Sequence, residues 1–283
     1  MFRRLGLITT TMLALLTTAV PAAAVSSSGA TTAVPPEVVN VAHRGASAYA
    51  PENTIAALKL ARDQRADMFE LDVQETKDHR LVLMHDTTLA RTTDVEQVFP
   101  GRAPWKVGDF TLAEIRRLDA GSWFATRYEG EAVPTLGEAL RAMSGSGLDL
   151  LLEVKAPHLY PGIEARIAAE LRRHPLWLDP GRTVVQSFDW DSMRTFRQVV
   201  PDLPIGLLGT PPVTDLPALA RFADQINPPH TALTEAYVRR VHALGMEVFT
   251  WTVDSRAAMR RLISLRVDGI ITNKPDVLRG VVR

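Results

Sequence analysis

Short apolar runs recur along the chain from residue 38 onward and alternate with amphipathic stretches. Nine runs have the length and composition of strands, and they are Val38–Ala42, Met68–Val73, Leu81–Met84, Leu148–Val154, Thr183–Val185, Ile205–Leu208, Gln225–Ile226, Val248–Val253 and Gly269–Thr272. Runs that are apolar throughout are typical of parallel sheets, whose strands are buried on both faces. Between the runs, apolar residues at helical spacing predict helices. Two examples are the sets Ile55, Leu58, Ala61 and Ala236, Val238, Val241, Leu244.

This alternation predicts an α/β fold, and a closed (β/α)8 barrel, the TIM barrel, accounts for it best. A barrel of that kind needs about 250 residues and eight strand–helix repeats. A doubly wound open sheet is the alternative, but no G-x-G-x-x-G pattern follows the first run. Nine runs are one too many for the barrel. Because the link from Val73 to Leu81 is too short for a crossover helix, we expect those two runs to form a hairpin or an irregular strand pair.

Residues 87–134 interrupt the alternation with a long segment that contains one clear predicted helix, near residues 112–118. Capping boxes at Thr111–Glu114 and Thr135–Glu138 predict the start of that helix and of the next one. A connection this long is usually functional or forms a small subdomain. We expect an inserted subdomain whose aromatic residues build a satellite core and contribute to a cap over the active site. These residues are Phe99, Trp105, Phe110, Trp123 and Phe124.

The first 36 residues do not share this pattern. Arg3 and Arg4 precede an apolar stretch that ends in small residues at Ala24, which is typical of an export signal over residues 1–24. An uncleaved anchor is the alternative, but five threonines, a glycine and a proline make this stretch a poor membrane span. Residues 25–36 are rich in Ser, Thr, Ala and Pro and predict a flexible leader before a folded domain at 37–283. We therefore expect a secreted or otherwise extracytoplasmic protein with no stable membrane span after processing.

Charge and cysteine content narrow the possible chemistry. The 32 basic and 32 acidic residues balance, so we expect no nucleic-acid partner. The absence of cysteine excludes disulfides, thiolate metal sites and a cysteine nucleophile. Carboxylates and the seven histidines remain as candidates for reactive chemistry.

Three acidic residues stand at the ends of two apolar runs. Glu70 and Asp72 are two residues apart, so they project from the same face of a strand, and Glu153 ends a later run. Carboxylates that meet in this way would form an all-oxygen site for a hard cation such as Mg²⁺, Ca²⁺ or Mn²⁺. The alternative is a buried ion pair in which Lys155 neutralises one acid.

Two histidines also follow predicted strands. His43 follows the first run and His85 the third, and barrel enzymes place their chemistry at the carboxyl ends of strands. Two imidazoles there could act as general base and general acid near neutral pH, although a single histidine is more often structural. Arg44 offers a bidentate donor for a phosphate, and Lys155 offers a point charge.

Eight motifs occur in a fixed order along the chain. They are His43-Arg44-Gly45, Pro51-Glu52-Asn53-Thr54, Glu70-Leu71-Asp72-Val73, His85-Asp86, Glu153-Val154-Lys155, Gln186-Ser187-Phe188, Trp251-Thr252-Val253 and Gly269-Ile270-Ile271-Thr272. Together they resemble the glycerophosphodiester phosphodiesterases, from about Val41 to Asp276. Phe110-Thr111-Leu112 and the stretch from Ala120 to Phe124 are similar to that family's inserted subdomain.

The resemblance implies a TIM barrel that hydrolyses small-molecule glycerophosphodiesters to glycerol 3-phosphate and an alcohol. It implies one divalent cation, Ca²⁺ or Mg²⁺, held by Glu70, Asp72 and Glu153. It also implies that His43 and His85 are the acid/base pair, without deciding which is the base. Attack by the substrate's own glycerol hydroxyl, through a cyclic phosphate, and direct attack by water both stay open.

Further binding residues follow from the same resemblance. Arg44 and Lys155 match phosphate-binding positions. Glu52 lies in the E-N-T motif, where it could instead favour a helix dipole. Trp251 would line the pocket against the glycerol, with packing inside the barrel as the alternative.

The chain departs from the family's motifs at two positions. The family often has Asn where this chain has Asp254, and Asp where it has Asn273. We expect these departures to affect substrate preference and loop geometry more than catalysis. Two other functions remain as alternatives: a phospholipase D-like barrel enzyme acting on intact phospholipids, and a catalytically silent glycerophosphodiester-binding protein.

Overall fold

The computed structural model describes residues 38–282, and within them eight parallel strands close into a barrel. The predicted signal peptide and leader, residues 1–36, lie outside the described residues. The barrel strands are β1 (Val39–Ala42), β2 (Met68–Glu75), β4 (Asp149–Val154), β5 (Thr183–Ser187), β6 (Ile205–Leu208), β7 (Gln225–Asn227), β8 (Glu247–Thr250) and β9 (Gly269–Thr272). Strand β1 pairs with β2 on one side and β9 on the other, which closes the sheet and confirms the predicted TIM barrel.

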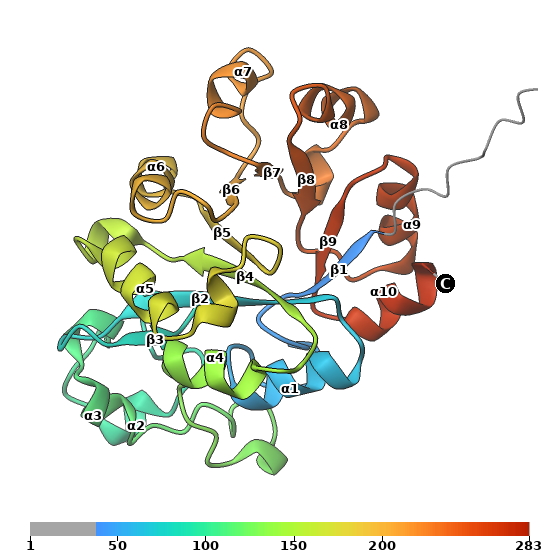
Figure 1. Ribbon diagram of the computed structural model, residues 1–283. Coiled ribbons are helices and arrows are strands. Elements are labelled where there is room, and N and C mark those ends of the chain that lie inside the picture. The colour runs from blue at the N-terminus through green and yellow to red at the C-terminus, as the bar shows by residue number, and fades with distance from the viewer. Residues whose placement is uncertain (1–37, 283) are drawn as a thin grey trace, which may run out of the picture. The chain divides into compact units, whose positions relative to one another are not determined.

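The helices lie around the outside of the barrel (Figure 1). Those between or after barrel strands are α1 (Ile55–Asp63), α4 (Leu136–Met143), α5 (Ile163–Arg172), α6 (Trp190–Val199), α7 (Leu216–Leu219), α8 (Glu235–His242), α9 (Arg256–Ser264) and α10 (Pro275–Val282). Short 3-10 turns are η3 (Pro157–Leu159), η4 (Pro175–Leu178) and η5 (His230–Ala232). Among residues 38–282, no helix combines the length and the hydropathy needed to cross a membrane.

Hydroxyl residues set where several helices begin. The Thr54 side chain accepts a hydrogen bond from the Ala57 amide at the start of α1, and Ser255 caps α9 in the same way. The predicted capping box at Thr135 is formed and starts α4. Leu58 and Ala61 of α1 are buried, as their spacing predicts, so this helix packs its apolar face on the barrel.

The third apolar run, the one too many for the barrel, forms β3 (Leu81–Leu83), which pairs antiparallel with β2 and confirms the predicted hairpin. The Met84 amide donates to the Asp72 carbonyl over 3.0 Å, so the returning arm of the hairpin ends beside Asp72, where the pairing of β2 with β4 also ends. His85 therefore reaches the mouth of the barrel by a different route from the one we expected. It follows an antiparallel arm outside the barrel, not the end of a parallel barrel strand.

Residues 87–134 form a small folded unit beside β3 (Figure 1). It contains α2 (Val95–Val98), α3 (Leu112–Ile115) and the 3-10 turns η1 (Val107–Asp109) and η2 (Thr126–Tyr128). The capping box at Thr111 is present, but α3 ends at Ile115, earlier than the predicted helix. Phe99, Trp105 and Phe110 join a cluster separate from the main core. Trp123 stays 40% exposed, and its ring meets that of Phe124 edge to face instead.

Gly45 shows why the turn after β1 needs a residue without a side chain. Its φ is +81°, and a Cβ there would lie 2.5 Å from the backbone carbon of Ala57 in α1. We expect Gly45→Ala to lower the free energy of unfolding by about 2–4 kcal/mol, because it adds a steric clash to left-handed strain. Denaturant unfolding measures this, with Gly130→Ala as the control.

Gly130 has a φ of +85° but nothing within 4 Å of its Cβ position. Gly130→Ala should therefore lower the free energy of unfolding only through left-handed backbone strain, by about 1–2 kcal/mol. Equal losses in the two variants would mean that the contact with α1 contributes nothing.

Candidate active site

The carboxyl ends of the strands surround a cavity of about 150 Å³ at one mouth of the barrel. Its walls come from segments far apart in the sequence, because each parallel strand ends at the same face. The lining includes the predicted site residues His43, Arg44, Glu70, His85, Glu153, Lys155 and Trp251. Residues 87–134, all of which the structure describes, contribute none of the lining residues, so the expected cap does not reach this cavity.

Three carboxylates meet at the cavity, and two of them, Glu70 and Glu153, line it. Asp72 lies directly opposite Glu153 in the β2–β4 register, and Glu70 is two residues earlier on β2. One oxygen from each of the three lies within 4.8 Å of the others, and all three side chains are buried. Strand pairing thus brings the predicted acids together.

Neighbouring donors occupy only some of these carboxylate oxygens. The Arg44 amide donates to Glu70 Oε2 over 2.6 Å, and Asn53 Nδ2 donates to Asp72 Oδ2 over 2.8 Å. Lys155 Nζ donates to Glu153 Oε1 over 2.8 Å, so the alternative ion pair is also present. Glu70 Oε1 and Asp72 Oδ1 are buried without a hydrogen-bond partner. Such oxygens, held close together, fit a hard divalent cation.

The proton affinities of the three acids reflect this crowding. Burial, followed by the charge of Asp72, raises the pKa of Glu70 well above its usual range. The same two causes raise the pKa of Glu153 to about 7. Burial is the largest cause and acts to raise the pKa of Asp72, but the charges of Lys155, Arg44 and His85 and the Asn53 hydrogen bond together lower that pKa to about 2. Crowding thus raises the proton affinity of two of the three acids, and a bound cation would offset the repulsion among the three carboxylates.

His43 and His85 have different hydrogen-bond partners. His43 Nδ1 lies 2.7 Å from Asn273 Oδ1, a neutral amide, whereas His85 Nδ1 lies 2.6 Å from Asp86 Oδ1, a carboxylate. Burial, with a smaller effect of Arg44, lowers the pKa of His43 to about 4. Burial also lowers the pKa of His85, against the opposing effects of Asp72 and Asp86. His43 is therefore uncharged near neutral pH.

Glu52 belongs to an ion-pair network behind these groups. It accepts from Arg44 NH1 over 2.9 Å and from both terminal nitrogens of Arg91 over 2.7 and 2.8 Å. Arg91 Nε also donates to Asp86 Oδ2 over 2.6 Å. Arg91 thus connects Glu52 to the partner of His85. No sequence pattern pointed to Arg91, because it lies in the irregular inserted segment.

Arg44 and Trp251 are held in fixed positions at the mouth. Arg44 has a φ of +56°, and its Nε lies 3.3 Å from Asp72 Oδ2. Strained backbone of this kind is found at functional sites. Trp251 Nε1 donates to the Asn227 carbonyl over 2.8 Å, and its ring meets Phe188 edge to face at 5.6 Å. Phe188 is 56% exposed, so the two rings form an aromatic wall beside the polar cavity.

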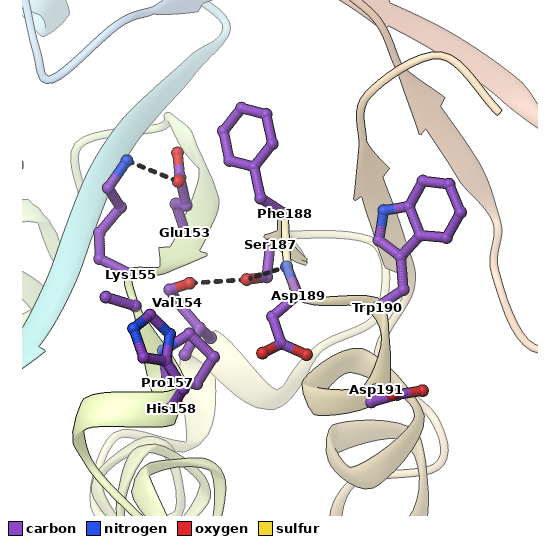
Figure 2. A pocket seen from close by; sticks show the side chains of 11 residues that line it. Glu153, Val154, Lys155, Pro157, His158, Ser187, Phe188, Asp189, Trp190 and Asp191 are labelled. Atoms are coloured by element: carbon purple, nitrogen blue, oxygen red, sulfur yellow. Dashed lines mark hydrogen bonds and ion pairs between the residues drawn. The ribbon is translucent and has the colours of Figure 1, made fainter.

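A second, larger pocket of about 580 Å³ adjoins the mouth and shares Glu153, Lys155 and Phe188 with it. Figure 2 shows this pocket between β4 and the start of α6, with the Lys155–Glu153 ion pair along one side. Ser187, at the end of β5, donates to the Val154 carbonyl at the end of β4 over 2.7 Å and so joins these two strands. The mouth cavity and this larger pocket are therefore neighbours with a common wall.

A closed parallel barrel with acids and two imidazoles at the mouth where its strands end defines the protein as a TIM-barrel enzyme. Residues 43–277 match the Glycerophosphoryl diester phosphodiesterase family. The chain belongs to this family and is a phosphoric diester hydrolase.

Individual relatives agree with this assignment. The chain is 38% identical to a glycerophosphodiester phosphodiesterase of Bacillus subtilis over 264 residues, covering 87% of each chain. It is also 38% identical to one of Caldanaerobacter subterraneus over 246 residues, covering 86% of this chain and 97% of the other. A phosphodiesterase of Oleispira antarctica, solved in complex with the product sn-glycerol-3-phosphate, has a TM-score of 0.78 and 28% identity over 86% of this chain and 95% of its own. These similarities favour neither of the two alternative functions.

Proposed function

We propose that the protein is a metal-dependent hydrolase that cleaves glycerophosphodiesters to glycerol 3-phosphate and an alcohol. The observation that carries this proposal is the arrangement of two imidazoles around a buried three-carboxylate site whose oxygens are only partly hydrogen-bonded. The Oleispira antarctica relative, named for its complex with sn-glycerol-3-phosphate, supports the same substrate class.

Glu70, Asp72 and Glu153 would hold the cation, Ca²⁺ or Mg²⁺, because an all-carboxylate donor set suits hard ions. When bound, such a cation would neutralise charge on the phosphodiester. Lys155 and Arg44 line the same cavity and add positive charge for the phosphate oxygens.

The two histidines divide the proton transfers. His43 is uncharged near neutral pH and has its Nδ1 engaged, so its Nε2 would accept the proton of the attacking hydroxyl. His85 has the Asp86 carboxylate behind its ring and would give a proton to the departing alkoxide. The attacking hydroxyl can be that of the glycerol or that of water. Detection of a cyclic phosphate by ³¹P NMR would distinguish the two routes.

Export is also part of the proposal. The basic start, apolar stretch and small-residue site over residues 1–24 support removal of a signal peptide and action outside the cytoplasm. N-terminal sequencing of the protein recovered from its native host tests this. A chain that starts at Met1 in the cytoplasm would contradict it.

A coupled assay of glycerol 3-phosphate release tests the reaction. We expect release from small diesters such as glycerophosphocholine, and loss of release in excess chelator. Head-group release from intact phospholipid vesicles alone would indicate the phospholipase D-like alternative. Tight binding of the diesters without product would indicate a silent binding protein.

A further inference from the structure

Behind His43 lies a row of hydrogen-bonded side chains, of which the proposed reaction uses only the contact at His43 Nδ1. Asn273, between β9 and α10, contacts the His43 ring, and Asp254, after β8, contacts Asn273. We propose that Asp254 and Asn273 act together as positioning residues that fix His43 in its Nδ1–H tautomer and leave Nε2 as the proton acceptor. This inference rests on the proposed function of His43.

The hydrogen bonds determine which way the Asn273 amide points. Asn273 Nδ2 donates to Asp254 Oδ2 over 2.7 Å, and the Asn273 backbone amide donates to Asp254 Oδ1 over 2.9 Å. Because a carboxylate only accepts, the NH₂ group must face Asp254 and the oxygen must face His43. Thr272 Oγ1 donates to Asp254 Oδ1 over 3.1 Å and helps to hold the carboxylate in place.

The orientation of Asn273 in turn determines the tautomer of His43. Asn273 Oδ1 lies 2.7 Å from His43 Nδ1 and can only accept, so the proton of a neutral His43 sits on Nδ1. Nε2 is then unprotonated, as a base requires. Ser47 Oγ lies 2.8 Å from Asn273 Oδ1 and 2.7 Å from the His43 carbonyl, which ties the turn after β1 to the same amide.

A neutral acceptor and a charged one would affect His43 differently. The Asn273 amide oxygen accepts from the ring and acts to raise the pKa of His43, but a carboxylate in its place would favour the charged imidazolium more strongly. The charged groups that act on His43 are Arg44, Asp72 and Glu52, and Arg44 opposes its protonation. Burial is the largest cause of the low pKa of His43, and with Asn273 in contact no anion touches the ring at Nδ1.

The same two positions are those where the sequence departs from the family's usual residues. The structure shows that Asp254 and Asn273 are in direct contact. The two departures therefore keep one acid and one amide in contact and exchange their positions. Our expectation that they bear mainly on loop geometry and substrate preference did not anticipate their contact with His43.

Tautomer and kinetics can be measured on the same variants. In ¹⁵N-labelled protein, long-range ¹H–¹⁵N correlation of the His43 ring should show the Nδ1–H form. In Asn273→Ala we expect a mixture of tautomers and a kcat lowered about 10–100-fold, with KM changed less than about 2-fold. Asn40→Ala is the control, because Asn40 Nδ2 donates to the Pro275 carbonyl over 2.9 Å and so joins β1 to α10 without touching His43. It should keep both the tautomer and kcat.

A second variant keeps the inference testable if Asn273→Ala unfolds. The single change Asn273→Asp places two carboxylates against each other, whereas the double change Asp254→Asn with Asn273→Asp restores an acid–amide pair. We expect the double variant to recover folding but to hold His43 as an imidazolium, which its ring ¹⁵N shifts would show.

Two results would overturn the inference: an unchanged Nδ1–H tautomer and kcat in Asn273→Ala, or an equal loss of kcat in Asn40→Ala. The NMR result does not depend on turnover. A failure of the proposed reaction, seen as full activity in His43→Ala, is therefore distinguishable from a failure of this inference.

Discussion

His43→Ala and His85→Ala should each lower kcat for a glycerophosphodiester by about 10²–10⁴-fold, the usual contribution of one general acid or base. Both rings line the mouth cavity, and each has a fixed partner at Nδ1, so neither can be replaced by a neighbouring histidine. Steady-state release of glycerol 3-phosphate measures the loss.

The control for the histidine variants is His79→Ala. His79 is 70% exposed in the turn of the β2–β3 hairpin and lies outside the mouth lining. Its replacement should leave kcat unchanged. Wild-type turnover in either His43→Ala or His85→Ala would remove that histidine from the mechanism.

Glu70→Gln and Asp72→Asn should each lower activity by about 10²–10³-fold at any cation concentration tested. The amides keep the shape of the side chains but remove the negative charge that a divalent cation needs. Chelation of the unsubstituted enzyme should abolish activity, and added Ca²⁺ or Mg²⁺ should restore it. Activity in chelator and in both variants at the level of the untreated enzyme would contradict a metal-dependent reaction.

A buried acid away from the mouth is the matched control for the carboxylate variants. Glu164 is 8% exposed on α5 and accepts a hydrogen bond from Ser192 over 2.6 Å. Glu164→Gln keeps this acceptor and should retain both activity and cation dependence. An equal loss in this variant would mean that any buried charge change disables the enzyme.

Much of the fold follows from local pattern, because strands buried on both faces must be apolar throughout. The ends of individual strands and helices are harder to predict from the sequence than the fold. The predicted run Val248–Val253 continues past β8, which ends at Thr250, since only backbone pairing with β7 and β9 decides where the strand stops. In α8, Val238 and Val241 are buried, whereas Ala236 is exposed, because neighbouring elements decide which small residues are covered.

Some contacts of the site could likewise be predicted from the sequence, and others could not. Glu70 and Asp72 could be placed together from the two-residue period of a strand, and the β2–β4 register then brings Glu153 beside them. The contact of Arg91 with Glu52 spans 39 residues between two irregular segments, and that of Asn273 with His43 spans 230. No local pattern encodes contacts of this kind, since they depend on how loops fold over the mouth.

The most direct test of the central claim is a crystal structure of the enzyme grown with Ca²⁺, with data collected for anomalous scattering. We expect one strong peak at the barrel mouth, with oxygens of Glu70, Asp72 and Glu153 about 2.3–2.6 Å away. Density without an ion there, with Lys155 still paired to Glu153 and no shared ligand among the three acids, would contradict the account.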